Sequence, residues 1–389
     1  MPKVDTPLAR VVLIIGHVAG MVDMAALPLW VGNLVERYGF NPQQAGGVVT
    51  LFLLGVVVAT LAVAPRFDRL PRRYLPAAGY GVAAFAFFVS SNSHQLGQLA
   101  LLHFLGGLGV GCGFSLTLGT MGRSVNPQRI FAYATAVLGV FAIAFLGQVP
   151  GLLVVHGGPI FFTVMMSVML VAALCTGLGF PVASHGDQAR VAQREPAQRF
   201  GRGIWLAIFA VVLMLTLNHA MTFSFIERIG IDRQFGASNV TRMLIASGVV
   251  GLFPSLIATL LQKRLSPYTV LIAVPWVQVG LAFVITHATT FMPYAFSGAV
   301  FPFVSLFAST FMFGLMSRLD PSGRAVAATP AMIMAGSAIA PFLAGTVVLG
   351  FGYEAIASGI AVVAFVSMML VLRISRATRA LIEVSIGMA

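Results

Sequence analysis

The sequence has few charged residues. Asp, Glu, Lys and Arg make up 9% of its 389 residues, against about a quarter in soluble domains. Hydrophobic residues make up 58%, and the mean hydropathy is +0.95. This composition excludes a soluble protein and is typical of a chain that crosses a membrane many times.

Cysteine is also scarce, and familiar catalytic patterns are missing. Cys112 and Cys175 lie far apart in apolar segments, so neither a disulfide framework nor a CxxC metal site is expected. There is no G-x-x-x-x-G-K-[ST] pattern for ATP and nothing that resembles a hydrolytic triad. We therefore expect no enzyme and no cofactor, and an ion or substrate gradient as the energy source. The first apolar run is too long for a cleavable signal peptide, so we expect it to remain as a membrane helix.

Apolar runs of about 20 residues, each long enough to cross a bilayer, occur twelve times. They must form helices, because an open sheet leaves its backbone unsatisfied in lipid. The expected spans are 10–34, 43–64, 74–92, 97–121, 130–153, 159–180, 203–226, 239–261, 268–287, 291–316, 325–349 and 352–373.

The basic residues fix the expected orientation. The net charge of +12 comes from short clusters between apolar runs and not from a basic domain, so no nucleic-acid partner is expected. If the N-terminus is cytoplasmic, 19 of the 23 Lys and Arg residues fall on the inner side and four on the outer. The positive-inside rule then predicts a multi-pass protein of the inner (plasma) membrane with both termini in the cytoplasm.

The halves of the chain resemble each other. The segment 182–202 is the only extended polar stretch, and it separates a predicted six-helix bundle (1–181) from a second one (203–376) and a cytoplasmic tail (377–389). "ERYGFNPQQAG" at 36–46 matches "ERIGIDRQFGAS" at 227–238, and "GTMGRSVNPQRIFAYATA" at 119–136 matches "GLMSRLDPSGRAVAATPA" at 314–331. The expected fold is an all-α membrane protein of two pseudo-symmetric six-helix bundles, an architecture of secondary transporters.

The loop between spans 2 and 3 carries a family pattern. "APRFDRLPRR" (64–73) resembles the G-x-x-x-D-R-x-G-R-[RK] motif of the major facilitator superfamily, although Ala64 and Pro71 replace its glycines. The matching positions are Asp68, Arg69, Arg72 and Arg73. The resemblance implies that this loop latches one conformation of the transporter; plain positive-inside topology is the alternative.

Two fainter patterns point to the same family. "HFLGGLG" (103–109) resembles R-x-x-Q-G-x-G, with His103 in the place of the arginine. "GQVPG" (147–151) resembles a Gly/Pro motif associated with antiporters. Such Gly and Pro residues also occur wherever membrane helices pack closely.

Few polar groups lie near the middle of a span. They are His17 and Asp23 in span 1, His103 in span 4, and Asn218 and His219 in span 7. Ionisable residues at this depth are costly and are functional candidates. No Lys or Arg lies there, which weighs against a strongly anionic substrate.

Each candidate has two interpretations. The family resemblance implies that spans 1, 4, 7 and 10 line a central cavity, where Asp23 would carry a proton or contact a cationic group. Its alternative role is a structural hydrogen bond. For His103 and His219, proton or substrate binding competes with ordinary packing, and for His17 packing is favoured.

The predicted function is proton-coupled transport of a small neutral, amphiphilic or cationic organic compound, with export favoured over import. A proton symporter that imports a small metabolite or organic acid is the alternative, and a receptor or scaffold is a third class. Copper import is a minor alternative, based on the pairs "HVAGM" (17–21) and "MFGLM" (312–316), although Met is also a common packing residue. We expect no resident metal and a monomeric protein.

Overall fold

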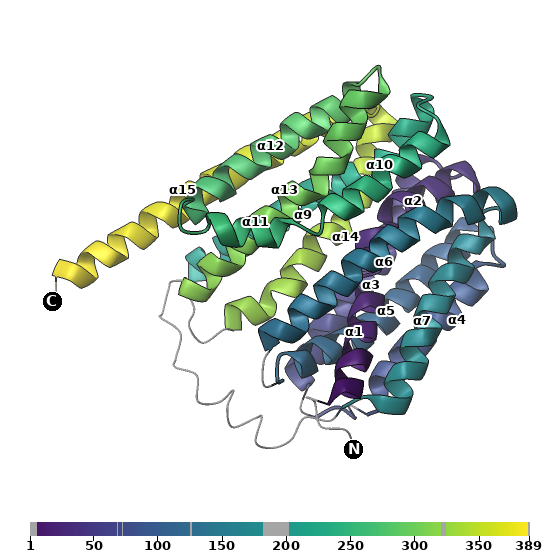
Figure 1. Ribbon diagram of the computed structural model, residues 1–389, viewed down its shortest axis with the longest axis horizontal. Coiled ribbons are helices and arrows are strands. Elements are labelled where there is room, and N and C mark those ends of the chain that lie inside the picture. The colour runs from purple at the N-terminus through teal and green to yellow at the C-terminus, as the bar shows by residue number, and fades with distance from the viewer. Residues whose placement is uncertain are drawn as a thin grey trace.

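The computed structural model describes residues 6–67, 69–71, 73–124, 127–181, 202–319 and 324–387. Within these ranges all regular structure is helical (Figure 1). The helices of the N-terminal half are α1 (Pro7–Gly20), α2 (Asp23–Glu36), α3 (Pro42–Val63), η1 (Ala64–Arg66), α4 (Leu75–Ser90), α5 (Leu96–Met121), α6 (Pro127–His156) and α7 (Pro159–Gly179). Those of the C-terminal half are α9 (Arg202–Asp232), α10 (Ala237–Val250), α11 (Pro254–Leu261), α12 (Pro267–His287), α13 (Phe291–Leu319), α14 (Arg324–Phe351) and α15 (Ala355–Gly387).

These helices make twelve passes. In the described ranges, 11 helical segments are long and apolar enough to cross a membrane, with α1–α2 and α10–α11 each counted as one segment. The twelfth, α4, has 16 residues, a length of about 24 Å at 1.5 Å per residue. The all-α fold of twelve membrane helices is confirmed.

Sequence signals at the helix starts explain the boundaries. Asn41 precedes Pro42 and accepts a hydrogen bond from the backbone N–H of Gln44 at 2.8 Å, while the Gln44 side chain accepts one from the backbone N–H of Asn41 at 3.1 Å. This capping box satisfies two backbone donors that the helix itself cannot satisfy. Span 2 therefore begins at Pro42.

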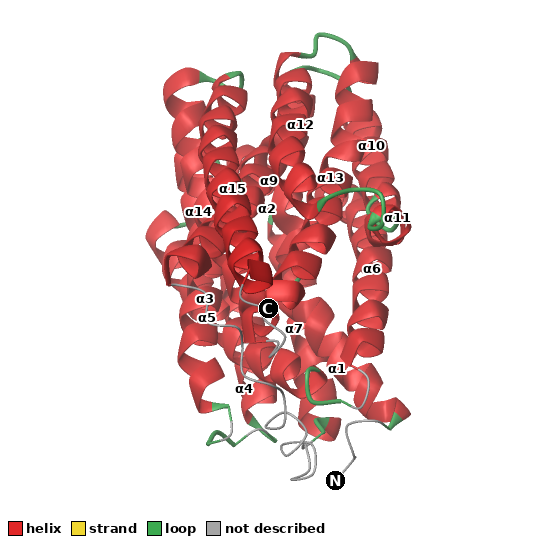
Figure 2. Ribbon diagram, turned by 90° about the vertical axis from the view of Figure 1, so that its left-hand side faces the viewer, coloured by secondary structure: helices red, strands yellow, loops and turns green. Residues whose placement is uncertain are grey.

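The helices form two bundles that lie side by side. Figure 1 shows α1–α7 (purple to teal) in one bundle and α9–α15 (green to yellow) in the other, and Figure 2 shows their helices running in a common direction. We call the end where α1 begins the terminal face. The opposite end, where α2 and α9 end, carries Glu36 and Asp232, and we call it the carboxylate face.

The bundles contact each other near the carboxylate face. Gln43 donates to Thr346 at 3.1 Å, and the backbone N–H of Phe342 donates to Thr50 at 3.1 Å. Gly46 lies against the carbonyl of Pro341 so closely that a Cβ would overlap it. These contacts join the start of α3 to the end of α14, so the molecule is closed at this face.

The structure differs from the expected spans in three places. Span 1 is interrupted, because α1 ends at Gly20 and α2 begins at Asp23. Span 8 is divided at 251–253, directly before Pro254, which cannot donate to a preceding turn. The last helix, α15, continues into the predicted tail as far as Gly387. The predicted linker 182–202 lies outside the described residues except at its last position.

Candidate functional site

Asp23 is the first residue of α2. The two residues before it, Met21 and Val22, separate α1 from α2, and Asp23 follows sixteen residues of the 30-residue first span. A helix N-terminus presents unpaired N–H groups and a positive partial charge, which stabilise a carboxylate. The interruption in span 1 therefore provides a favourable place for an acidic side chain near the middle of the membrane.

Two further features keep this region irregular. A Cβ on Gly20 would overlap the ring of Phe114, so the end of α1 packs closely on α5. Pro28 lies inside α2 and cannot donate to the carbonyl of Met24. Span 1 thus has a non-helical joint and a missing helical bond within one stretch of chain.

The Asp23 side chain is buried, with 4% of its surface exposed. No ion pair joins it to a Lys, Arg or His among the described residues. Its polar neighbours are the backbone groups of Asp23 and Met24. An unpaired carboxyl at this depth costs much less energy as the neutral acid than as the anion, so the site is suited to binding a proton.

In the second bundle, α9 carries a group of unsatisfied polar side chains at a similar depth. Asn218 and Thr222 lie one turn apart and are fully buried. Neither amide atom of Asn218 has a hydrogen-bond partner, and neither has the Thr222 hydroxyl. Buried polar groups are normally paired, so this part of α9 has binding capacity that the protein itself does not use.

His219 adjoins this group. Its ring stacks on Phe223 and Phe301, with centroid distances of 5.2 and 5.6 Å, and its Nδ1 has no hydrogen-bond partner. We call Asn218, His219 and Thr222 the α9 polar group. Asn218 and His219 are neighbours in the sequence, and the structure adds Thr222, which the sequence interpretation missed. Thr222 could have been identified from the sequence, because it lies four residues after Asn218 and so on the same face of the helix.

His103 has a different environment. Its Nδ1 is 2.7 Å from the carbonyl of Leu99, and its Nε2 accepts from Trp30 Nε1 at 3.2 Å. With Nδ1 as the donor, both ring nitrogens are satisfied in the neutral form. Trp30 lies seven residues beyond Asp23, about 10 Å along α2. The structure therefore joins His103 to Trp30, two turns away from Asp23.

His103 and Trp30 belong to an aromatic core of the first bundle. The contacting rings are Phe52, Phe87, Phe161 and Phe162. His17 is also buried, and its ring contacts Phe114 and Phe131, although its Nδ1 is unsatisfied. The packing interpretation of His17 fits these contacts.

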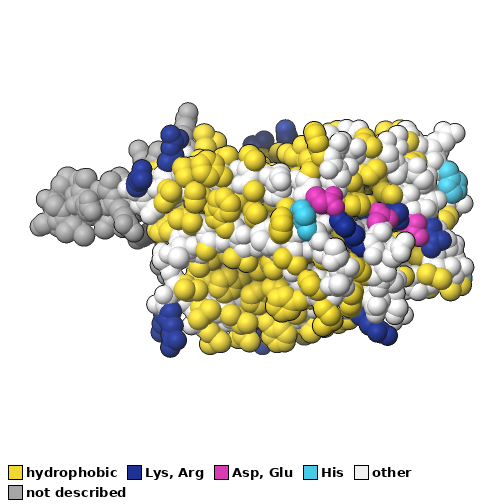
Figure 3. Space-filling model, turned by 90° about the horizontal axis from the view of Figure 1, so that it is seen from above, with side chains coloured by type: hydrophobic (Ala, Val, Ile, Leu, Met, Phe, Trp, Pro, Cys, Tyr) yellow, Lys and Arg dark blue, Asp and Glu magenta, His cyan; other side chains and the backbone are white. Residues whose placement is uncertain are grey.

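The carboxylate face carries a charge network that the sequence interpretation did not identify. Arg228 of α9 pairs with Asp232 at 2.6 Å and with Glu36 of α2 at 3.6 Å, so one guanidinium links the bundles. Arg233 pairs with Glu354. Figure 3 shows acidic and basic side chains in one row on this part of the surface.

Tyr353 extends the network. Its hydroxyl donates to Asp232 at 2.7 Å, and burial together with this bond raises the pKa of Tyr353. Burial also raises the pKa of Tyr38, in the loop after α2, to about 12. Both phenols therefore remain neutral at physiological pH.

The proposed latch is only partly described. Asp68 and Arg72 lie outside the described residues. Arg69 and Arg73 lie in the loop between η1 and α4, and the Arg73 guanidinium lies 5.0 Å from the centre of the Tyr74 ring. The latch remains a prediction.

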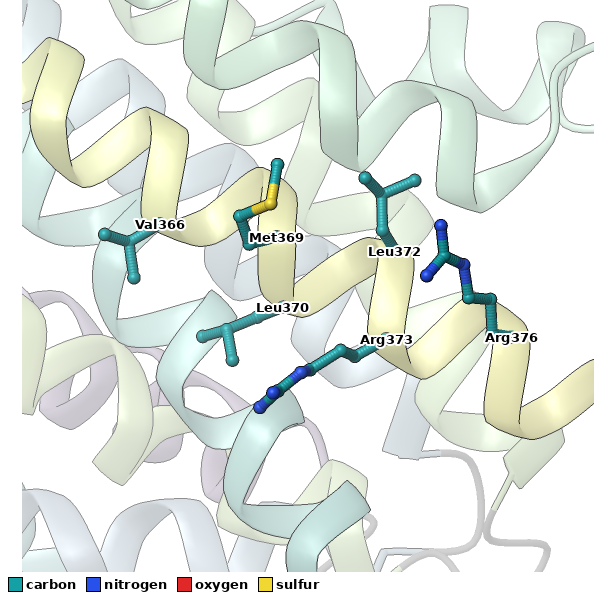
Figure 4. Close-up of a pocket in the computed structure, with 6 residues that line it drawn as sticks. All are labelled: Val366, Met369, Leu370, Leu372, Arg373 and Arg376. Atoms are coloured by element: carbon teal, nitrogen blue, oxygen red, sulfur yellow. The ribbon is translucent and has the colours of Figure 1, made fainter.

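One surface pocket of about 440 Å³ lies elsewhere, along the terminal half of α15. Figure 4 shows its lining side chains on this single helix; they are Val366, Met369, Leu370, Leu372, Arg373 and Arg376. It contains none of the predicted site residues. Among the described residues, no three His, Cys, Asp or Glu side chains gather as a metal site would require.

Comparison with known proteins gives the family. The sequence model of the Major Facilitator Superfamily matches residues 12–322. The chain is 28% identical over 105 residues to the arabinose-proton symporter of Bacillus subtilis (strain 168), an alignment that covers 27% of this chain and only 23% of that relative.

Solved structures show the same fold. The nucleoside transporter NupG superposes with a TM-score of 0.69 at 15% identity, and a mutant of NupG superposes with 0.74 at 12% identity. Each comparison covers 94% of this chain and 99% of the other. The predicted resemblance is confirmed: this chain belongs to the Major Facilitator Superfamily, a family of membrane transporters and not of enzymes.

Proposed function

We propose that the protein is a proton-coupled secondary transporter of a small, neutral or cationic organic compound. Asp23 carries the coupling proton, and the α9 polar group binds the substrate. The two six-helix bundles alternate between conformations open to either side of the inner membrane, with both termini in the cytoplasm, and the protein works as a monomer.

The observation that carries this proposal is the unpaired, buried carboxyl of Asp23 at the start of α2. A buried group without an ion partner changes its proton occupancy when its exposure to water changes. Because α2 packs against α9 of the other bundle, a movement of the bundles alters the surroundings of this helix. Proton binding and alternating access are therefore linked at span 1.

The α9 polar group supports the substrate class. An amide, an imidazole and a hydroxyl offer both donors and acceptors but no fixed positive charge. They suit a compound with hydroxyl, amide or amine groups better than a strong anion. Both ring nitrogens of His103 have hydrogen-bond partners within the protein, so we propose that His103 holds Trp30 in position. A role of His103 in proton coupling stays a prediction to be tested.

The direction of transport has two candidates. Exchange of the compound for protons, with net export, is the first. Symport with net import is the second, and the similarity to an arabinose-proton symporter over about a quarter of each chain favours it. In both, the proton gradient supplies the energy.

The test uses purified protein in liposomes that contain a pH-sensitive dye. Compounds that raise the thermal stability of the protein, taken from sets of sugars, nucleosides and amines, are added outside. Proton movement that depends on one of these compounds supports the proposal, and its sign distinguishes exchange from symport. Transport of such a compound without any proton movement would refute the coupling.

A further inference from the structure

Glu227 is a half-buried glutamate at the boundary between the two bundles. It lies near the end of α9, and its Oε2 atom is inaccessible to water and has no hydrogen-bond partner. Oε2 rests on Gly32 of α2, where any Cβ would overlap it. The carboxyl group thus fills a space on the facing helix that only a glycine leaves open.

Among the residues that the structure describes, no cation forms an ion pair with Glu227. The charged groups that act on it are Glu36 and Arg37 from α2 and Arg228 and Asp232 from α9. Arg228 is already paired with Asp232 and Glu36, and Arg37 with Glu36 at 3.9 Å. These four charges balance, so an ionised Glu227 would add an uncompensated negative charge.

The remaining titratable neighbour cannot compensate that charge. Tyr294 of α13 acts on Glu227, but its hydroxyl donates to the carbonyl of Ile226 at 2.6 Å. A negative charge with one oxygen shielded from water and without a hydrogen bond is costly here, whereas the neutral acid is tolerated. Closure of the contact between α2 and α9 therefore favours a protonated Glu227.

The internal repeat provides a comparison within the molecule. In the alignment of 36–46 with 227–238, Glu36 corresponds to Glu227 and Arg37 to Arg228. Glu36 has 42% of its side chain exposed and is paired with arginine. The two equivalent glutamates thus have different environments: Glu36 is exposed and paired, whereas Glu227 is half-buried and its Oε2 has no hydrogen-bond partner.

We propose that Glu227 is a second proton-binding site, which takes up a proton when the carboxylate face closes and releases it when α2 and α9 separate. This inference rests on the proposed coupling to protons and adds a second residue to it. Through linkage, protonation stabilises the closed conformation. Low pH therefore favours closure, and the closed population falls as the pH rises, by up to tenfold per pH unit for a single proton.

The test measures the separation of the bundles without any substrate. Spin labels are attached at Gln95→Cys and Thr289→Cys, two exposed loop positions on the carboxylate face of different bundles, after replacement of Cys112 and Cys175 by serine. The distances between the two spin labels are recorded in lipid nanodiscs from about pH 5 to about pH 9. This range covers carboxyl groups with normal and with raised pKa values.

We expect the distance to lengthen as the pH rises, and Glu227→Gln to hold the short distance throughout. Glu354→Gln is the matched control and should keep the response, because Glu354 is exposed, pairs with Arg233 and is not among the charges that act on Glu227. A response in Glu227→Gln as large as in the parent when both carry Asp23→Asn, or no response in the parent protein, would overturn the inference. A protonated-carboxyl infrared band that is present in the closed state and lost in Glu227→Gln is a second readout on the same samples, and its absence would equally count against the proposal.

The design separates this inference from the proposed function. Asp23, as the proposed coupling residue, can add its own pH response, so the distances are also recorded with Asp23→Asn present in both the parent and Glu227→Gln. The part of the response that Glu227→Gln removes in this background belongs to Glu227. If Glu227 governs the distance but the liposomes show no proton-coupled transport, the inference stands and the proposed function fails. If transport is proton-coupled and Glu227→Gln leaves the distance response intact, the inference alone fails.

Discussion

Individual side chains in the middle of the membrane divide into satisfied and unsatisfied groups. His103 uses both ring nitrogens within the first bundle, whereas Asn218 uses neither amide atom. A satisfied group contributes to stability, and an unsatisfied one is available for a ligand. The two types of residue should therefore respond to substitution in opposite ways.

Replacement of His103 should mainly destabilise the protein. His103→Ala leaves Trp30 Nε1 without an acceptor and opens a cavity among the aromatic rings, and we expect a loss of about 2–4 kcal/mol. Thermal unfolding in detergent measures this change. If His103→Ala instead keeps its stability and shifts the pH profile of transport, His103 takes part in coupling after all.

Replacement of Asn218 should mainly affect binding. Asn218→Leu removes a buried amide that has no partner and keeps a similar volume, so the unfolding free energy should be unchanged or higher by about 1 kcal/mol. Binding of a compound that stabilises the parent protein should weaken at least about tenfold, which corresponds to 1.4 kcal/mol. Normal affinity in this variant would remove Asn218 from the substrate site.

At the scale of helices, the contact between α3 and α14 depends on glycine. A Cβ at position 46 would overlap the carbonyl of Pro341, whereas one at Gly47 would meet only the Phe342 ring at 3.6 Å, an ordinary contact. Neighbouring glycines on one helix thus have different importance for closure of the carboxylate face.

This difference predicts the behaviour of two matched variants. Gly46→Ala should hold the bundles apart and reduce transport at least about tenfold, while Gly47→Ala should stay within about twofold of the parent rate. The same pair of spin labels reports the separation. Equal behaviour of the two variants would contradict the proposed role of this contact.

The helix boundaries show how far the sequence could predict these elements. Length and apolar composition are enough to place twelve passes, because a continuous apolar run of about 20 residues crosses a bilayer as a helix. The joint before Asp23 was not predicted, since no proline or polar cluster marks it; the close approach of Gly20 to Phe114 becomes visible only in three dimensions. The division of span 8 could have been predicted from Pro254, but Pro254 lies within a continuous apolar run, so a single span was expected there.

For the whole molecule, the distribution of basic residues predicts the orientation in the membrane. A cysteine at Thr289, on the carboxylate face, should react with a membrane-impermeant maleimide in intact cells. One at Ser266, exposed on the terminal face between α11 and α12, should react only after permeabilisation. The reverse pattern would invert the predicted topology.

The site could be predicted from the sequence only in part. Asp23, Asn218 and His219 are visible as polar residues in apolar runs, but their partners are not. The bond between Trp30 and His103 joins residues 73 positions apart, and the contact of Glu227 with Gly32 joins different bundles. No local pattern encodes such pairs, because the packing of whole bundles creates them.

The most direct test of the central claim compares Asp23→Asn with the parent protein in liposomes, using a compound found by the stability screen. The neutral amide keeps the size of the side chain but cannot bind or release a proton. We expect the variant to bind the compound and to exchange it across the membrane without a gradient, while uphill transport driven by a pH gradient is lost. Uphill transport at the parental rate in Asp23→Asn would contradict the account.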